Sequence, residues 1–408
     1  MKHHLNPRMA SLVLVFGIFF TLSCSTFNTS KESAESLFQQ NNYQKALQAV
    51  DRELEDNPDN PELLLLKGQI LKQYAVNNYL PEQRKSVYQN FRNTLLQTTY
   101  SESAHQNTAD SLLVSAWRFE QSSGVELLQQ DESQSFDQHF ERVIAHFDNA
   151  TEIIPDSIVT YNLKATTYYR HGNLADAIAT LEGIEEAGMT RPPETCEKLA
   201  YLYLEAGQVD ESIWIYESLA ENNPDMEIYH QGLVNSYILG NRHEEAVGKL
   251  NELIERYPNR MQYREAHATE RYYLLRRDLE EQINEPSADP VSADDAQSVV
   301  NELNQISDTF REVDQSLPSS EERQQRIASF LVNSAAILEQ LSQVTENEDA
   351  AETLRSHSED QLNASIGYWQ SLYDSNSDQT AYARSLVDVY KKLGMESEAE
   401  LLEQQINF

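Results

Sequence analysis

Apolar positions recur along most of the chain at intervals of three and four residues, which is the spacing of one face of an α-helix. The alternation of single apolar and polar residues that predicts strands is hard to find. Glycine, asparagine and proline break the helical pattern at short intervals. We therefore expect an all-α protein built from helix-turn-helix units.

The breaks are periodic. The repeated pattern is a tyrosine, a glycine four residues later and an alanine five residues after that, with close substitutes at some positions. Its copies are Tyr168, Gly172 and Ala177; Tyr203, Gly207 and Ser212; Tyr237, Asn241 and Ala246; and Tyr390, Gly394 and Ala399. Glycine or asparagine can take the left-handed conformation that ends a helix, and the alanine lets two helices approach closely. Tyrosine fills the gap between units, and the prolines that follow, Pro224 and Pro258, end the second helix.

This pattern resembles the tetratricopeptide repeat, Trp-x2-Leu-Gly-x2-Tyr, then Ala-x3-Phe, then Pro. The best copy is Cys196-x2-Leu199-Ala200-x2-Tyr203, with Ser212-x3-Tyr216 and Pro224. Copies in the same phase start at Tyr161, His230 and Ala383, and a split copy covers Ala46 to Gly68. The resemblance implies a solenoid of stacked helical hairpins over 33–284, a competitor being an irregular helical bundle.

Longer, irregular helices are expected at 81–98, 106–129 and 260–283, where the chain departs from the repeat. A linker loop is expected at 285–295, "EPSADPVSADD", followed by a helical region over 296–408 that ends in a repeat-like hairpin. Within it, an apolar seam of alternating fours and threes predicts a closely packed helix pair that turns at 317–320. The seam runs through Val299, Leu303, Ile306, Phe310, Val313 and Leu317, and returns through Ile327, Leu331, Ser334, Leu338 and Leu341. The pair either packs within the solenoid, which we favour, or forms an oligomer interface.

The N-terminal residues have the order of a secretory signal. Residues 1–9 carry only positive charge, and 10–22 form an apolar run that is too short to span a membrane. The next residues complete "FTLSC", which resembles the lipobox of bacterial lipoproteins, with Thr21 where an aliphatic residue is usual. The resemblance implies a signal peptide over 1–23, lipidation of Cys24 and a tether over 24–32. By the same resemblance, Ser25 after the cysteine implies a location at the outer membrane, facing the periplasm. The alternative is an ordinary secretory signal with a chance cysteine.

The net charge of the chain limits the kinds of partner that it can bind. The chain has 66 acidic and 31 basic residues, a net charge of −35, which repels nucleic acid and anionic lipid headgroups. Membrane attachment would then depend on acyl chains. Cys196 is the one cysteine besides Cys24, so packing rather than a disulfide has to stabilise the fold.

No catalytic or metal-binding pattern stands out. The chain lacks phosphate-binding glycine loops, nucleophile elbows and zinc-type histidine or cysteine spacing, so we predict no enzyme, no metal site and no cofactor. Cys196 occupies a packing position of the repeat, and burial there would leave it inert.

The remaining candidate is a binding surface. First helices line the inner wall of such solenoids, and the resemblance assigns twelve inward positions, which are Asn162, Thr166, Tyr169, Arg170, Glu197, Tyr201, Glu205, Gln231, Asn235, Glu265, Thr269 and Tyr272. Because glutamates stand at inward sites such as 197 and 265 and lysine is missing from them, a basic or polar ligand is favoured over a carboxylate. We expect a lipid-anchored envelope scaffold that binds other envelope proteins or peptides. The alternative is a solute-binding or pore-forming subunit of a periplasmic (TRAP-type) uptake system, suggested by "DNPDNPELLLLKGQILKQYA". The oligomeric state stays open.

Overall fold

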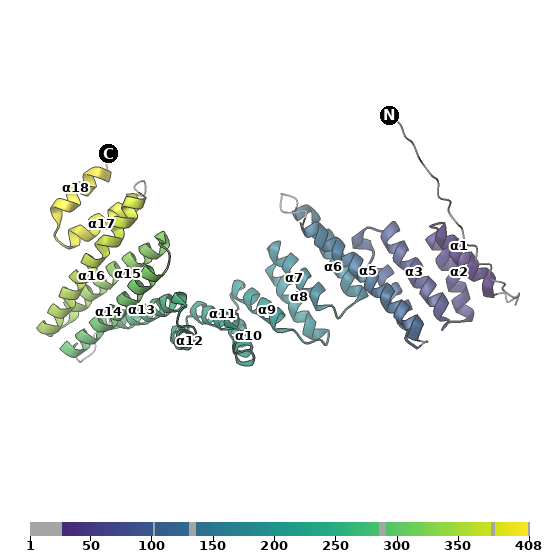
Figure 1. The fold of residues 1–408 in the computed structure, drawn as a ribbon, viewed down its shortest axis with the longest axis horizontal. Coiled ribbons are helices and arrows are strands. Elements are labelled where there is room, and N and C mark those ends of the chain that lie inside the picture. Colours follow the sequence, from purple (N-terminus) through teal and green to yellow (C-terminus); the bar gives the residue numbers. More distant parts are fainter. Residues whose placement is uncertain (1–26, 101–102, 130–135, 285–290, 377–379, 407–408) are drawn as a thin grey trace, which may run out of the picture. The chain divides into compact units, whose positions relative to one another are not determined.

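The computed structural model describes residues 27–100, 103–129, 136–284, 291–376 and 380–406. It divides into two compact units, one up to Arg191 and one from Pro192. All regular elements of these described ranges are helices, as the periodicity predicts (Figure 1).

The first unit consists of helices that pack mainly against their neighbours in the chain. It contains α1 (Phe27–Gln39), α2 (Tyr43–Asp56), α3 (Pro61–Asn78), the 3-10 turn η1 (Pro81–Gln83), α4 (Lys85–Leu96), the 3-10 turn η2 (Gln97–Tyr100), α5 (Ser103–Gln129), α6 (Phe136–Ile153), α7 (Ile158–Arg170) and α8 (Leu174–Glu186). The closest pairs are α1 with α2, α3 with α4, α5 with α6 and α7 with α8.

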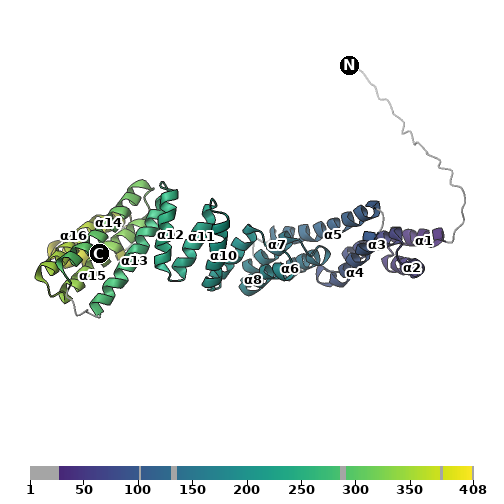
Figure 2. The same cartoon turned by 90° about the horizontal axis from the view of Figure 1, so that it is seen from below.

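The second unit continues the pattern of hairpins, and Figure 2 shows α10, α11 and α12 following one another along it. It contains α9 (Pro193–Glu205), α10 (Val209–Asn222), α11 (Glu227–Leu239), α12 (His243–Arg256), α13 (Met261–Asn284), α14 (Ala293–Ser316), α15 (Glu321–Val344), α16 (Glu348–Ser375), α17 (Thr380–Lys392) and α18 (Glu396–Ile406). The long helices α13 to α16 separate the repeat-like hairpins from the last one, α17 and α18.

The first helix of each repeat ends where the sequence predicts. Gly172, Gly207, Asn241 and Gly394 have φ angles of 83°, 73°, 56° and 70°, so all four lie in the left-handed region. After α7, the amide of Asn173 donates to the carbonyl of Tyr168 at 2.9 Å, which closes the helix end. Asn41 (φ 60°) ends α1 in the same way, a helix end that the sequence analysis did not single out.

Two glycines of one hairpin should therefore respond to substitution in opposite ways. Gly172→Ala places a side chain in the left-handed region and should lower the free energy of unfolding by about 1 kcal/mol. Gly183 lies inside α8, where an added Cβ meets nothing within 4 Å, so Gly183→Ala should raise it by about 0.5–1 kcal/mol. Urea unfolding of the two variants tests this difference, and equal shifts would contradict the assigned helix end.

The recurring small residues hold the helices together. Ala177, Ala246 and Ala399 are fully buried, as is Ser212 in the repeat that lacks the alanine. The Ser212 hydroxyl lies 3.1 Å from that of Ser236 on α11, which satisfies a polar group that would otherwise be buried without a partner. Close approach of the two helices is thus preserved in every repeat.

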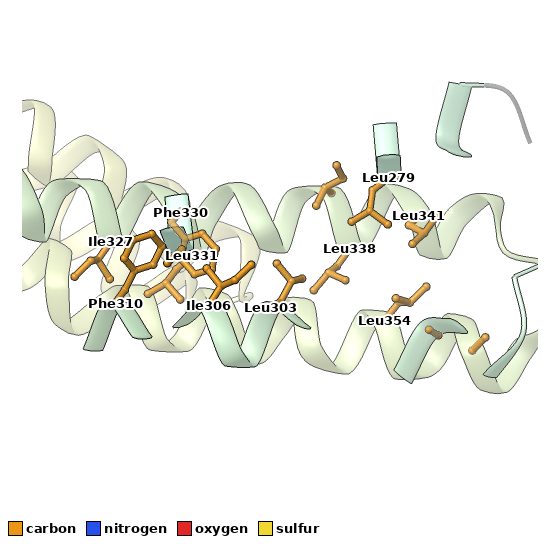
Figure 3. Close-up of a cluster of buried hydrophobic side chains, with 14 residues drawn as sticks. Leu279, Leu303, Ile306, Phe310, Ile327, Phe330, Leu331, Leu338, Leu341 and Leu354 are labelled. Atoms are coloured by element: carbon orange, nitrogen blue, oxygen red, sulfur yellow. The ribbon is translucent and has the colours of Figure 1, made fainter. Parts of the chain in front are cut away.

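The long C-terminal helices form a core of four helices rather than of two. The predicted turn lies between α14 and α15, and the seam residues Leu303, Phe310 and Leu338 are buried (Figure 3). However, α15 packs most extensively against α16, and α14 lies against α13 and α16. Helix α16 joins this core through Ala350 and Leu354, which lie outside the predicted seam. The seam is covered within the chain, the option that the sequence favoured.

Two predicted boundaries fall inside helices. Helix α1 begins at Phe27, within the predicted tether 24–32, and α14 begins at Ala293, within the predicted linker 285–295. The signal peptide and Cys24 lie outside the described residues. Among the described helices, none is both long and apolar enough to cross a membrane.

Candidate functional site

A polar pocket lies between the starts of α11 and α13, the first helices of two successive hairpins. It has a volume of about 430 Å³ and is lined by Glu227, Ile228, Gln231, Arg260, Gln262 and Tyr263. Gln231 Nε2 donates to the Tyr263 hydroxyl at 2.7 Å, and that hydroxyl donates to Glu227 Oε1 at 2.5 Å. We call the side of the second unit formed by α9, α11 and α13 the first-helix surface.

The electrostatics of the pocket favour a fixed hydrogen-bond network. Burial raises the pKa of Tyr263 to about 12, and the hydrogen bond to Glu227 acts in the same direction. The phenol therefore stays protonated, and Arg260 Nη2 lies 3.3 Å from the Glu227 carboxylate. Ile228 is 46% exposed at the rim and adds an apolar contact. These groups are suited to binding a polar or basic chain segment.

Helices α9 and α11 carry five of the predicted inward positions. Gln231 lines the pocket, and Asn235, one turn further along α11, is exposed. On α9, Tyr201 is 43% exposed, Glu205 is exposed and Glu197 is half-buried. One predicted inward position, Gln231, therefore lines the pocket. Glu227 and Tyr263 also line it but were not predicted.

The three positions predicted on α13 make contacts within the chain. Glu265 lies 3.3 Å from Arg326 Nη1 and 3.9 Å from Arg323 Nε, both on α15. Thr269 Oγ1 donates to the Glu265 carbonyl at 2.9 Å, and the Tyr272 ring meets the Phe330 ring edge-on, with centroids 4.7 Å apart. Helix α15 supplies the basic groups at this carboxylate.

The four remaining positions lie on α7, in the first unit. Asn162, Thr166 and Tyr169 are half-buried and Arg170 is exposed. Thr166 Oγ1 donates to the Asn162 carbonyl at 2.7 Å.

The described ranges also contain buried clusters of ionisable side chains. No three His, Cys, Asp or Glu side chains are grouped there as they would be around a metal ion. The most buried carboxylate, Glu120, is held by Arg84 at 2.9 Å and by His146 at 2.6 Å. Each of these groups is thereby engaged in packing the first unit.

Comparison with known proteins agrees with the periodicity. A family model described as "Tetratricopeptide repeat" matches residues 32–73 and 197–260. The second match includes four of the residues that line the pocket, Glu227, Ile228, Gln231 and Arg260. This chain contains tetratricopeptide repeats. Stacked hairpins of this kind can hold other proteins on their surface, so the repeats suit a protein-binding scaffold.

Solved structures of other tetratricopeptide-repeat proteins are similar. YrrB, described as having an unusual peptide-binding site, is 14% identical, with 43% of this chain and 80% of that chain covered and a TM-score of 0.32. A tetratricopeptide-repeat protein of Parabacteroides merdae is 15% identical, with 67% and 99% covered and a TM-score of 0.38. The repeat domain of P58(IPK) is 14% identical, with 91% and 99% covered and a TM-score of 0.28. Among curated proteins, none matched.

The last repeat-like hairpin, α17 and α18, contributes to a second pocket that the sequence did not predict. It has a volume of about 550 Å³, lies between α15, α16 and α17, and is lined by Gln325, Ser329, Val332, Asn333, Trp369, Ser385, Asp388, Val389, Lys391 and Lys392. Lys391 and Lys392 occupy the repeat positions that Tyr169 and Arg170 occupy on α7. Counting the repeat phase from Ala383 would have found them, so lysine does occur at inward positions of this array. Lys391 Nζ lies 2.6 Å from Glu403 Oε1.

Proposed function

We propose that the protein is a scaffold of the bacterial cell envelope that is anchored by lipid on Cys24. The residue after the cysteine, Ser25, favours the periplasmic face of the outer membrane as its site of action. Its first-helix surface binds other envelope proteins. The observation that carries the binding part is the Glu227, Gln231 and Tyr263 network between α11 and α13. The lipobox-like "FTLSC" supports the anchored part.

The pocket chemistry supports a basic or polar segment as ligand. Glu227 presents a carboxylate, Gln231 an amide and Ile228 an apolar edge. A single side chain of the ligand can therefore form both an ion pair and an apolar contact here. At Glu265, arginines of α15 already occupy the neighbourhood of the carboxylate. That contact within the chain is an example of the pairing that a basic ligand would make at Glu227.

A solute-uptake subunit is the alternative. A deep apolar pocket bordered by the long helices would support it, because a solute has to be enclosed. The pockets at α11 to α13 and at α15 to α17 are instead lined mainly by polar and charged side chains. This supports the scaffold over the uptake subunit.

Blocking the pocket should remove the partner. Gln231→Arg places a long cation beside Glu227, where it imitates a bound basic side chain, and recovery of partners from detergent-solubilised envelopes should fall at least about tenfold. Gln282→Arg makes the same substitution at an exposed position near the end of α13 and should leave recovery unchanged. Equal recovery with both variants, or a small solute in place of a protein in the purified sample, would overturn the proposal.

Anchoring is tested separately. Cys24→Ser should abolish incorporation of labelled fatty acid and release the protein from the membrane fraction. Continued incorporation in this variant would contradict the lipid anchor while leaving the binding proposal intact.

A further inference from the structure

The outward face of α10 carries a tryptophan that the first-helix surface does not use. Trp214 is 70% exposed, whereas Trp369 is 6% exposed and Trp117 donates its indole N–H to Thr160 Oγ1 at 3.0 Å. The residues on either side of Trp214, Ile213 and Ile215, are buried. Helix α10 therefore packs against its neighbours through its other faces and exposes Trp214, its largest side chain, to solvent.

Acidic side chains surround this tryptophan. Asp210 and Glu211 lie one turn before Trp214, and Glu221 lies two turns after it, on the same face of α10. All three side chains are exposed. From residue 199 to 241 the sequence has no lysine or arginine. The face is therefore strongly anionic even for this acidic chain.

Two arginines that follow α10 in the chain are engaged elsewhere. The Arg242 guanidinium lies 4.9 Å from the centre of the Tyr237 ring, and its Nε is 2.8 Å from Glu245. Arg256 donates to the Pro224 carbonyl. At the repeat position of Trp214 on the next second helix, α12, stands Gly248, where an added Cβ would meet nothing within 4 Å.

From this arrangement we propose that the outer face of α10 is a second docking surface, and that its occupant is a basic segment of another protein. The indole supplies apolar area and attracts a lysine or arginine placed over its face, while Asp210, Glu211 and Glu221 pair with flanking cations. A second copy of this chain, with its net charge of −35, and an anionic lipid surface are both repelled by such a face. This surface is separate from the pocket at Gln231, so the protein would join two partners.

A peptide titration tests the proposal on the full chain in mild detergent. The probe is a short fluorescein-labelled peptide of repeated Lys-Leu-Ala-Lys-Ala units, followed by anisotropy, with the Glu-for-Lys peptide as its counterpart. Wild type should bind the basic peptide, and Trp214→Ala should weaken binding about 30-fold. Added salt should also weaken it, because ion pairs contribute.

Leu401→Ala is the matched control. Leu401 is 60% exposed at the same repeat position of α18, so its truncation removes apolar surface without touching α10. Binding that is unchanged in Leu401→Ala and weakened in Trp214→Ala supports a site at Trp214. Equal affinity of wild type and Trp214→Ala, equal binding of the acidic peptide, or loss of a dimer in Trp214→Ala would overturn the proposal.

Discussion

Glu120→Ala should destabilise the first unit by about 3–5 kcal/mol, one of the two largest effects that we expect from a single substitution. The Glu120 side chain is completely buried, and it accepts hydrogen bonds from Arg84 at 2.9 Å and from Tyr88 at 2.6 Å. Its second oxygen lies 2.6 Å from His146 Nδ1. Removing the carboxylate leaves the buried Arg84 without a counter-charge, which costs more than a lost contact between neutral groups.

The effect should be confined to the first unit and should depend on the carboxylate. Hydrogen exchange followed by mass spectrometry should show faster exchange in α5 and α6 and unchanged exchange in α13 to α16. Glu126→Ala, an exposed position on the same helix, should change the free energy of unfolding by less than about 0.5 kcal/mol. If both variants were equally stable, the buried network would not be what holds these helices.

Glu120 should also make the stability of the first unit fall at acidic pH. Burial raises the pKa of Glu120, but the hydrogen bonds from His146 and Tyr88 and the nearby positive charges outweigh burial and lower the pKa below the ordinary value of 4.5. The stabilisation from the ionised carboxylate is therefore complete above pH 4.5 and is lost as the pH falls through the lower value of the folded state. Urea unfolding between neutral and acidic pH should show this loss in wild type and a smaller one in Glu120→Gln.

Leu338→Ala should destabilise the second unit by about 2–5 kcal/mol. Leu338 is fully buried in the core shared by α13, α14, α15 and α16, beside Leu303 and Leu341 (Figure 3). Truncation there removes apolar contacts and leaves a cavity that the surrounding helices can fill only in part. Urea unfolding measures the change.

Gln340→Ala is the control for this substitution because Gln340 is exposed on the same helix. It should alter the free energy of unfolding by less than about 0.5 kcal/mol. If α14 and α15 formed an isolated pair, Leu338→Ala would leave hydrogen exchange in α13 and α16 unchanged, and that result would contradict the four-helix core.

The repeats could be predicted because their determinants are local. Gly172, Gly207 and Asn241 end helices through their own backbone conformation, and Ala177 and Ala246 act through their small size, so each signal is visible in a few adjacent residues. The repeat phase then predicted that Gln231 would lie on the first-helix surface, where it lines a pocket.

The rest depends on contacts between distant residues. Arg323 and Arg326 reach Glu265 across more than fifty residues of sequence, and no local pattern pairs α15 with α13. Tyr263 joins Glu227 and Gln231 through a hydroxyl group whose direction is set by the stacking of two hairpins. The exposure of Trp214 likewise follows from which faces of α10 are covered. Such features follow from the three-dimensional packing of the helices and not from a local sequence pattern.

Hydrogen exchange of the full chain, measured with and without a copurified protein partner, can decide whether the first helices bind that partner. The account predicts slower exchange in the partner complex at the start of α11 and of α13, around Gln231 and Tyr263, because these first helices form the binding surface. Unchanged exchange in both segments, with protection elsewhere in the chain, would contradict it.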